Sequence, residues 1–117
     1  MHRLWRATLN SWHGIRAAAK SEAAFREELV ALALSIPVAF FITIEAWKRL
    51  ALIGVILLLI MVELLNTAIE KLSDRVSTAR EPDIGSIKDM SSAAVGVALA
   101  IAGLTWLLAL AEWLSLI

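Results

Sequence analysis

The sequence predicts an all-α integral membrane protein, in which an N-terminal amphipathic surface helix precedes three transmembrane helices. Of the 117 residues, 60% are apolar and only 19% are charged, whereas soluble domains are nearer half apolar and a quarter charged. From Met90 to Ala111 no residue is charged, which is typical of a membrane-spanning helix. The length allows one domain over 1–117 and leaves no room for a P-loop or Rossmann fold.

Charge balance and cysteine content exclude several function classes. Eleven basic and eleven acidic residues cancel, so no overall field favours a nucleic-acid partner. The chain has no cysteine, which rules out disulfides, thiolate metal sites and cysteine nucleophiles.

The N-terminal segment 3–20 is predicted to form an amphipathic helix. Its apolar residues fall on or near one helical face, and basic residues supply the other side: Leu4, Trp5, Leu9, Trp12 and Ile15 against Arg3, Arg6, His13, Arg16 and Lys20. This pattern favours a helix that lies in the membrane interface. The alternative is an ordinary short cytoplasmic helix.

The first predicted span covers 22–45. Its uncharged part, 29–44, would be about 24 Å long as a helix, slightly short of a bilayer core of ~30 Å. We therefore expect the span to include the preceding turns from Glu22 onward.

The second and third predicted spans cover 48–74 and 87–115. Between residues 50 and 69 the only charge is Glu63, and after Met90 the only charge is Glu112. The polar stretch between these spans, 71–89, contains Pro82, Asp83 and Gly85, which are expected to stop a helix and turn the chain. Five basic residues in the N-terminal arm and four in 71–89, against two in 45–49, place the N-terminus in the cytoplasm.

Polar residues form a stripe on the second span. At 100° per residue, Glu63, Asn66, Glu70 and Asp74 fall at about 0, −60, −20 and +20°. An unpaired carboxylate within the membrane is costly, so such residues usually face a protein interior or a water-filled site. The alternatives are that Glu70 and Asp74 are solvated and paired with nearby cations, that a protonated Glu63 holds helices together, and that Asn66 does the same.

Two further clusters are expected at the same membrane surface. Glu22, Arg26, Glu27 and Glu28 precede the uncharged part of the first span; their simplest interpretation is a Glu22–Arg26 salt bridge on a helix. A second cluster, 88–92, opens the third span and is also explained by an ordinary capped helix start. Carboxylates that have no His or Cys nearby suit a hard cation such as Mg²⁺. Mg²⁺ together with nearby Lys and Arg suits a nucleoside triphosphate. A carboxylate at the lipid level could accept a proton from a lipid hydroxyl.

The run Glu63-Leu-Leu-Asn66-Thr-Ala-Ile-Glu70, followed by Asp74-Arg75 and by Lys88-Asp89-Met-Ser-Ser92-Ala-Ala, resembles the prokaryotic integral-membrane diacylglycerol kinases, whose relatives include undecaprenol kinases. The resemblance implies a homotrimer of three-span protomers in the bacterial inner membrane, with composite active sites between neighbouring protomers. It implies transfer of the γ-phosphate of ATP, with Mg²⁺, to the hydroxyl of diacylglycerol.

The resemblance also implies roles for individual residues. Glu63 matches the general base and Asn66 its catalytic partner, while Glu22 and Glu70 match the metal-holding carboxylates. The matched ATP contacts are Arg3, Asn10, Glu22, Glu70, Lys88 and Asp89, and the matched substrate contacts are Arg3, Arg26, Glu28, Glu63 and Ser92. Asn10 replaces a tyrosine of some members, and 79–87 lacks a histidine often found there, so adenine contacts are not carried over to that segment.

Two other functions stay open from the sequence. An undecaprenol kinase would use the same residues, because both lipids present a primary hydroxyl at the membrane surface. A non-enzymatic helical membrane subunit or small proton-conducting oligomer would use Glu63 and Glu70 as relay or packing groups.

Overall fold

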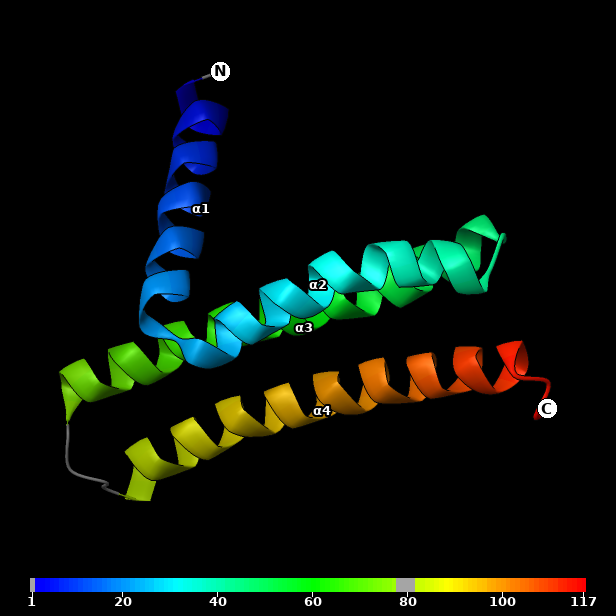
Figure 1. Ribbon diagram of the computed structural model, residues 1–117. Coiled ribbons are helices and arrows are strands. Elements are labelled where there is room, and N and C mark those ends of the chain that lie inside the picture. Colours follow the sequence, from blue (N-terminus) through cyan, green and yellow to red (C-terminus); the bar gives the residue numbers. More distant parts are fainter. Residues whose placement is uncertain (1, 78–81) are drawn as a thin grey trace.

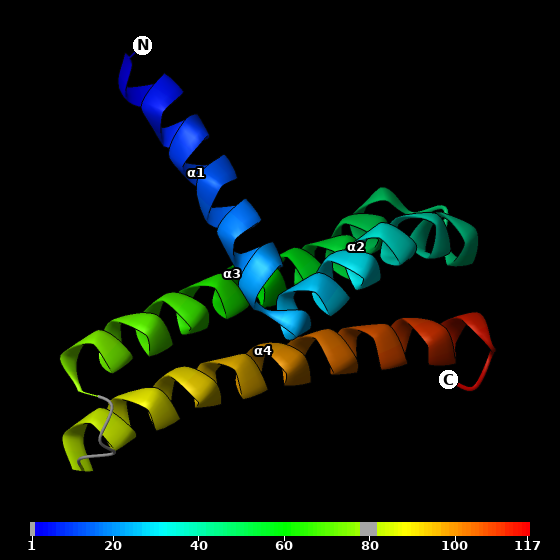
Figure 2. The same cartoon turned by 60° about the vertical axis from the view of Figure 1, so that its left-hand side comes forward.

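The computed structural model describes residues 2–77 and 82–117. Four helices make up nearly all of this part of the chain: α1 (His2–Ser21), α2 (Ala23–Ile42), α3 (Ala46–Val76) and α4 (Pro82–Trp113). The helices α2, α3 and α4 run side by side as a bundle, and α1 projects steeply away from it (Figures 1 and 2). Helix α3 packs against both α2 and α4, so it is the central element of the bundle.

Helix α1 forms over the segment in which the sequence predicts an amphipathic helix. Its apolar side chains, including Leu4, Trp5 and Trp12, are exposed in the isolated chain. Only Glu22, in extended conformation, separates α1 from α2, which allows the sharp change of direction between them. A helix that lies across the bundle axis and exposes tryptophans suits a membrane surface; that location itself stays a prediction.

Two helices within the described residues are long and apolar enough to cross a membrane, Ala46–Val76 and Asp83–Trp113. Helix α2 does not reach this standard, because Arg26, Glu27 and Glu28 lie in its first turns and leave a shorter apolar length. The first of the three predicted spans therefore stays a prediction.

The connection between α3 and α4 is shorter than the expected polar loop 71–89. Helix α3 continues to Val76 and α4 starts at Pro82, so Asp83 and Gly85 lie inside a helix rather than in a turn. A proline is well tolerated in the first helical turn, where its missing N–H has no intrahelical partner to lose, and the carboxylate of Asp83 interacts favourably with the helix N-terminus. The start of the segment 79–87 lies outside the described residues.

A small apolar core fixes the junction of α1 and α2 against α3. Phe25 is fully buried, and it packs with Ala18 of α1 and Ile60 of α3. Farther along the bundle, Trp106 Nε1 of α4 donates a 3.0 Å hydrogen bond to the carbonyl oxygen of buried Leu52 on α3. These contacts hold the three long helices in one register.

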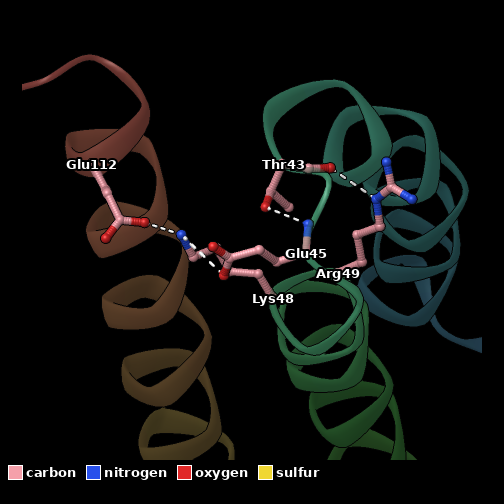
Figure 3. Close-up of polar contacts among 5 residues, drawn as sticks. All are labelled: Thr43, Glu45, Lys48, Arg49 and Glu112. Carbon is pink, nitrogen blue, oxygen red and sulfur yellow. Dashed lines mark hydrogen bonds and ion pairs between the residues drawn. The ribbon is translucent and has the colours of Figure 1, made fainter.

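A polar cluster closes the end of the bundle opposite the α3–α4 connection (Figure 3). Lys48 forms ion pairs with Glu112 of α4 and, at 3.7 Å, with Glu45. Arg49 Nε donates a 2.8 Å hydrogen bond to the Thr43 carbonyl oxygen at the end of α2. The cluster therefore joins the ends of α2 and α4 to the start of α3.

Candidate functional site

The polar stripe of α3 lies partly inside the bundle. Glu63 is 8% exposed and Asn66 is 9% exposed, Glu70 is half-buried, and Asp74 is exposed. Burial therefore decreases from Glu63 toward the C-terminal end of α3, as expected for a stripe that begins in the apolar part of a helix and ends in polar surroundings.

Glu63 of α3 lies within electrostatic range of three other carboxylates of α3 and the start of α2. Glu63 interacts electrostatically with both Glu70 and Glu22, and Glu28 interacts electrostatically with Glu63. One oxygen of Glu28, Oε1, is buried and has no hydrogen-bond partner among the described residues. Because like charges at close quarters repel one another, such a cluster is suited to a cation or a proton.

The cluster fits an ion that is only partly held by protein. Within residues 2–77 and 82–117, no three His, Asp or Glu side chains converge as a complete metal cage. Mg²⁺ usually takes only one or two carboxylates and completes its shell with water and substrate phosphates. Glu22 and Glu70 would supply that number of carboxylates, and their role as a metal-holding pair stays a prediction.

A hydrogen-bonded chain connects α4 to this cluster. Ser91 Oγ donates to Asn66 Oδ1 at 2.6 Å, and Asn66 Nδ2 donates to Glu70 Oε1 at 3.3 Å. Sequence reasoning selected the neighbouring Ser92, which is exposed, and missed Ser91. The signal was present, since Ser91 belongs to the same polar start of the third span, but choosing between adjacent serines requires the rotation of α4 about its axis.

Lys88 of α4 and Asp74 of α3 form an ion pair across the same two helices. The alternative that Asp74 is simply paired with a nearby cation is therefore confirmed in the isolated chain. Lys88 is half-buried, whereas Asp89 is exposed. An ammonium group therefore lies at the end of the stripe that carries Glu70 and Asp74.

Arg26 has a different partner from the expected one. Its guanidinium Nη1 donates to the carbonyl oxygen of Ala19 at 2.8 Å and of Lys20 at 3.3 Å, instead of pairing with Glu22. These carbonyls belong to the last turn of α1, where a cation is favoured by the helix dipole. Arg26 thus fixes the angle between α1 and α2 in the isolated chain.

Arg3 and Asn10 are exposed and belong to the part of α1 that leads away from the bundle (Figures 1 and 2). A single chain does not bring them to the carboxylate cluster. Between the second half of α1 and α3 lies a groove of about 510 Å³ with mainly apolar walls, lined by residues that include Gly14, Ala18, Leu64 and Lys71. A lipid chain could occupy a groove of this character.

The model of the family described as prokaryotic diacylglycerol kinase matches residues 9–110. The chain belongs to this family. It is 42% identical to the diacylglycerol kinase of Escherichia coli K12 over 104 residues. These residues are 89% of this chain and 85% of that protein. It is 44% identical to the diacylglycerol kinase of Pseudomonas aeruginosa over 106 residues, and these residues are 91% of this chain and 86% of that protein.

A more distant relative, the diacylglycerol kinase of Helicobacter pylori J99, is 31% identical over 104 residues, 89% of this chain and 81% of that protein. The predicted family is therefore confirmed, and with it the prediction of a kinase. The alternative of a non-enzymatic membrane subunit loses its support. The chain thus combines a buried carboxylate, Glu63, with two helices able to cross a membrane.

Proposed function

We propose that this membrane kinase transfers the γ-phosphate of ATP to the hydroxyl of diacylglycerol, giving phosphatidic acid. The observation that carries the proposal is the electrostatic proximity of Glu63 to Glu22, Glu28 and Glu70, in a chain of the diacylglycerol kinase family. The helix that carries Glu63 also lines an apolar groove through Leu64. Phosphoryl transfer depends mainly on positioning and on charge neutralisation, and both can be supplied where lipid and water meet.

In the proposed reaction, the lipid hydroxyl oxygen attacks the γ-phosphorus and the bond to ADP breaks. Glu63 accepts the hydroxyl proton, so a buried carboxylate becomes neutral as the step proceeds. Lys88 binds the phosphates, for which it must exchange its present partner Asp74. Glu22 and Glu70 would hold Mg²⁺, which neutralises charge on the phosphates when bound.

We further propose that the working enzyme is a homotrimer with sites shared between neighbouring protomers. Arg3 and Asn10 lie on a helix that leads away from the cluster of their own chain, so they would reach the cluster of a neighbour. Large apolar side chains are exposed along the bundle helices, among them Leu34, Leu57 and Leu104. Lipid and a second copy are the two surroundings that such side chains suit.

Within the membrane, α2 is proposed as a third span beside α3 and α4. The basic residues of the N-terminal arm then lie in the cytoplasm, in agreement with the charge bias of short loops, and the proposed location is the bacterial inner membrane. Asp89, Ser92 and Arg26 keep their proposed contacts with nucleotide or lipid in this assembly.

The competing substrate is undecaprenol, which the same residues could phosphorylate. A paired assay in mixed micelles distinguishes the two lipids: purified protein receives labelled ATP and Mg²⁺ with diacylglycerol in one tube and undecaprenol in the other. Labelled phosphatidic acid as the main product supports the proposal. A product mainly from undecaprenol would keep the kinase but overturn the substrate.

A further inference from the structure

Ser91 makes the one buried side-chain hydrogen bond that links α4 to the carboxylate cluster in the described part of the chain. Its hydroxyl lies 2.6 Å from Asn66 Oδ1, and the two residues are 7% and 9% exposed. From the other end of the same amide, Asn66 Nδ2 reaches Glu70 Oε1 at 3.3 Å. Three groups from two helices thus form one continuous chain that ends on a carboxylate.

The hydrogen bond from Ser91 helps to fix the orientation of the Asn66 side-chain amide. A carboxylate only accepts hydrogen bonds, and an amide has one accepting and one donating end. With Oδ1 bound by the Ser91 hydroxyl, Nδ2 faces Glu70. If the hydroxyl were absent, Oδ1 would be left buried without this donor, which is unfavourable, and the amide would be free to leave the orientation in which it holds the carboxylate.

The location of Ser91 favours a role in the site over simple joining of helices. Helices α3 and α4 are already joined by the Trp106–Leu52 hydrogen bond and by the ion pairs of Lys88 and Lys48. None of these contacts involves Asn66, Glu63 or Glu70. Of these contacts between α3 and α4, only the Ser91 hydrogen bond is made to a residue, Asn66, that directly contacts Glu70.

We propose that Ser91 is a positioning residue for the kinase site: through Asn66 it holds the Glu70 carboxylate in the orientation that binds the metal ion of the nucleotide. The inference rests on the proposed function, in which Glu70 is a metal-holding group. It concerns the second layer of contacts around that carboxylate, and such contacts commonly change metal affinity 10- to 100-fold.

The test compares Ser91→Ala with Ser35→Ala. Ser35 is a matched control because it is also a buried serine, but its hydroxyl donates to the carbonyl oxygen of Leu32 in its own helix. Two quantities are measured: the Mg²⁺ concentration for half-maximal lipid phosphorylation, and Mn²⁺ binding in the presence of a non-hydrolysable ATP analogue, followed by electron paramagnetic resonance. In Ser91→Ala, we expect the half-maximal Mg²⁺ concentration to rise about tenfold and Mn²⁺ binding to weaken about tenfold. The kcat at saturating metal should be less affected. Ser35→Ala should change neither quantity.

Two further variants separate positioning from packing. Ser91→Thr keeps the hydroxyl, and the adjoining groove of about 500 Å³, which Ser91 lines with Ser73 and Met90, has room for the added methyl group, so this variant should restore metal affinity. In an Asn66→Ala background, Ser91→Ala should cause no additional loss.

Wild-type metal affinity in Ser91→Ala, or an equal loss with and without Asn66, would overturn the inference. The Mn²⁺ measurement does not depend on turnover. It therefore distinguishes failure of the role proposed for Ser91 from failure of the proposed function. A tenfold Mn²⁺ shift would uphold the role of Ser91 even if the wild-type protein phosphorylated a different lipid.

Discussion

Lys88 and Asp74 form an ion pair that joins the beginning of α4 to the end of α3. In the proposed reaction the same ammonium group binds the phosphates of ATP, so nucleotide competes with Asp74 for it. The pair therefore keeps the cation in place, and partly neutralised, until the substrate arrives.

Replacing Lys88 should impair the use of ATP. We expect Lys88→Ala to lower kcat/KM for MgATP by about 10²-fold or more, since it removes a charge that faces the transferred phosphoryl group. The control is Lys20→Ala, because Lys20 is an exposed lysine in the last turn of α1; kcat/KM of this variant should stay near the wild-type value. Equal kcat/KM for both variants would remove Lys88 from the site.

Replacing Glu70 should change the response to metal. Glu70→Gln keeps the size of the side chain and lessens its affinity for a cation, so the Mg²⁺ concentration for half-maximal activity should rise at least about tenfold. Glu45→Gln provides the control, because Glu45 is an exposed carboxylate at the other end of the bundle, where it pairs with Lys48. An unchanged Mg²⁺ titration for Glu70→Gln would exclude the ligand role.

Phe25 should contribute more to stability than other phenylalanines. It is fully buried where α1, α2 and α3 meet, so Phe25→Ala leaves a cavity and should cost roughly 3 kcal/mol or more of the free energy of unfolding. Phe41 is 76% exposed, and Phe41→Ala should cost less than about 1.5 kcal/mol, as expected when only an edge contact with Trp113 is lost. Reversible unfolding in detergent measures both, and similar losses would contradict this description of the core.

The ion pairs of Lys48 (Figure 3) should affect stability without affecting catalysis, because they lie at the start of α3, whereas Glu63 and Glu70 lie in its C-terminal half. Glu112→Gln removes a link between two helices, whereas Glu45→Gln removes a contact within one turn. We expect Glu112→Gln to lower the melting temperature more than Glu45→Gln at low salt, and the difference to vanish at high salt. A large loss of kinase activity in either variant would show that this end of the bundle communicates with the site.

Much of the bundle could be predicted from the chain itself. Helix periodicity placed Glu63, Asn66 and Glu70 on one face, and the observed Asn66–Glu70 hydrogen bond agrees with that spacing. The polar start of the third span directed attention to 88–92, where Lys88 does reach α3. The shared face follows from the geometry of a single helix, and the polar start of the third span follows from its residue types.

Features that depend on how helices meet were beyond such reasoning. Selecting Ser91 over Ser92 requires the rotation of α4 against α3, and the bond from Arg26 to the last carbonyls of α1 requires the bend at Glu22. The start of α4 at Pro82 was also missed, because proline ends one helix and begins another with equal ease.

In the proposed reaction, the buried Glu63 carboxylate of α3 accepts the proton of a lipid hydroxyl. Glu63→Gln tests it most directly, with diacylglycerol phosphorylation and binding of a non-hydrolysable MgATP analogue measured on the same preparation. Loss of a general base should reduce turnover by about 10²-fold or more. Nucleotide affinity should stay near wild type, because in the proposed reaction Glu63 acts on the lipid and not on the nucleotide. Turnover at the wild-type rate in Glu63→Gln would contradict the account.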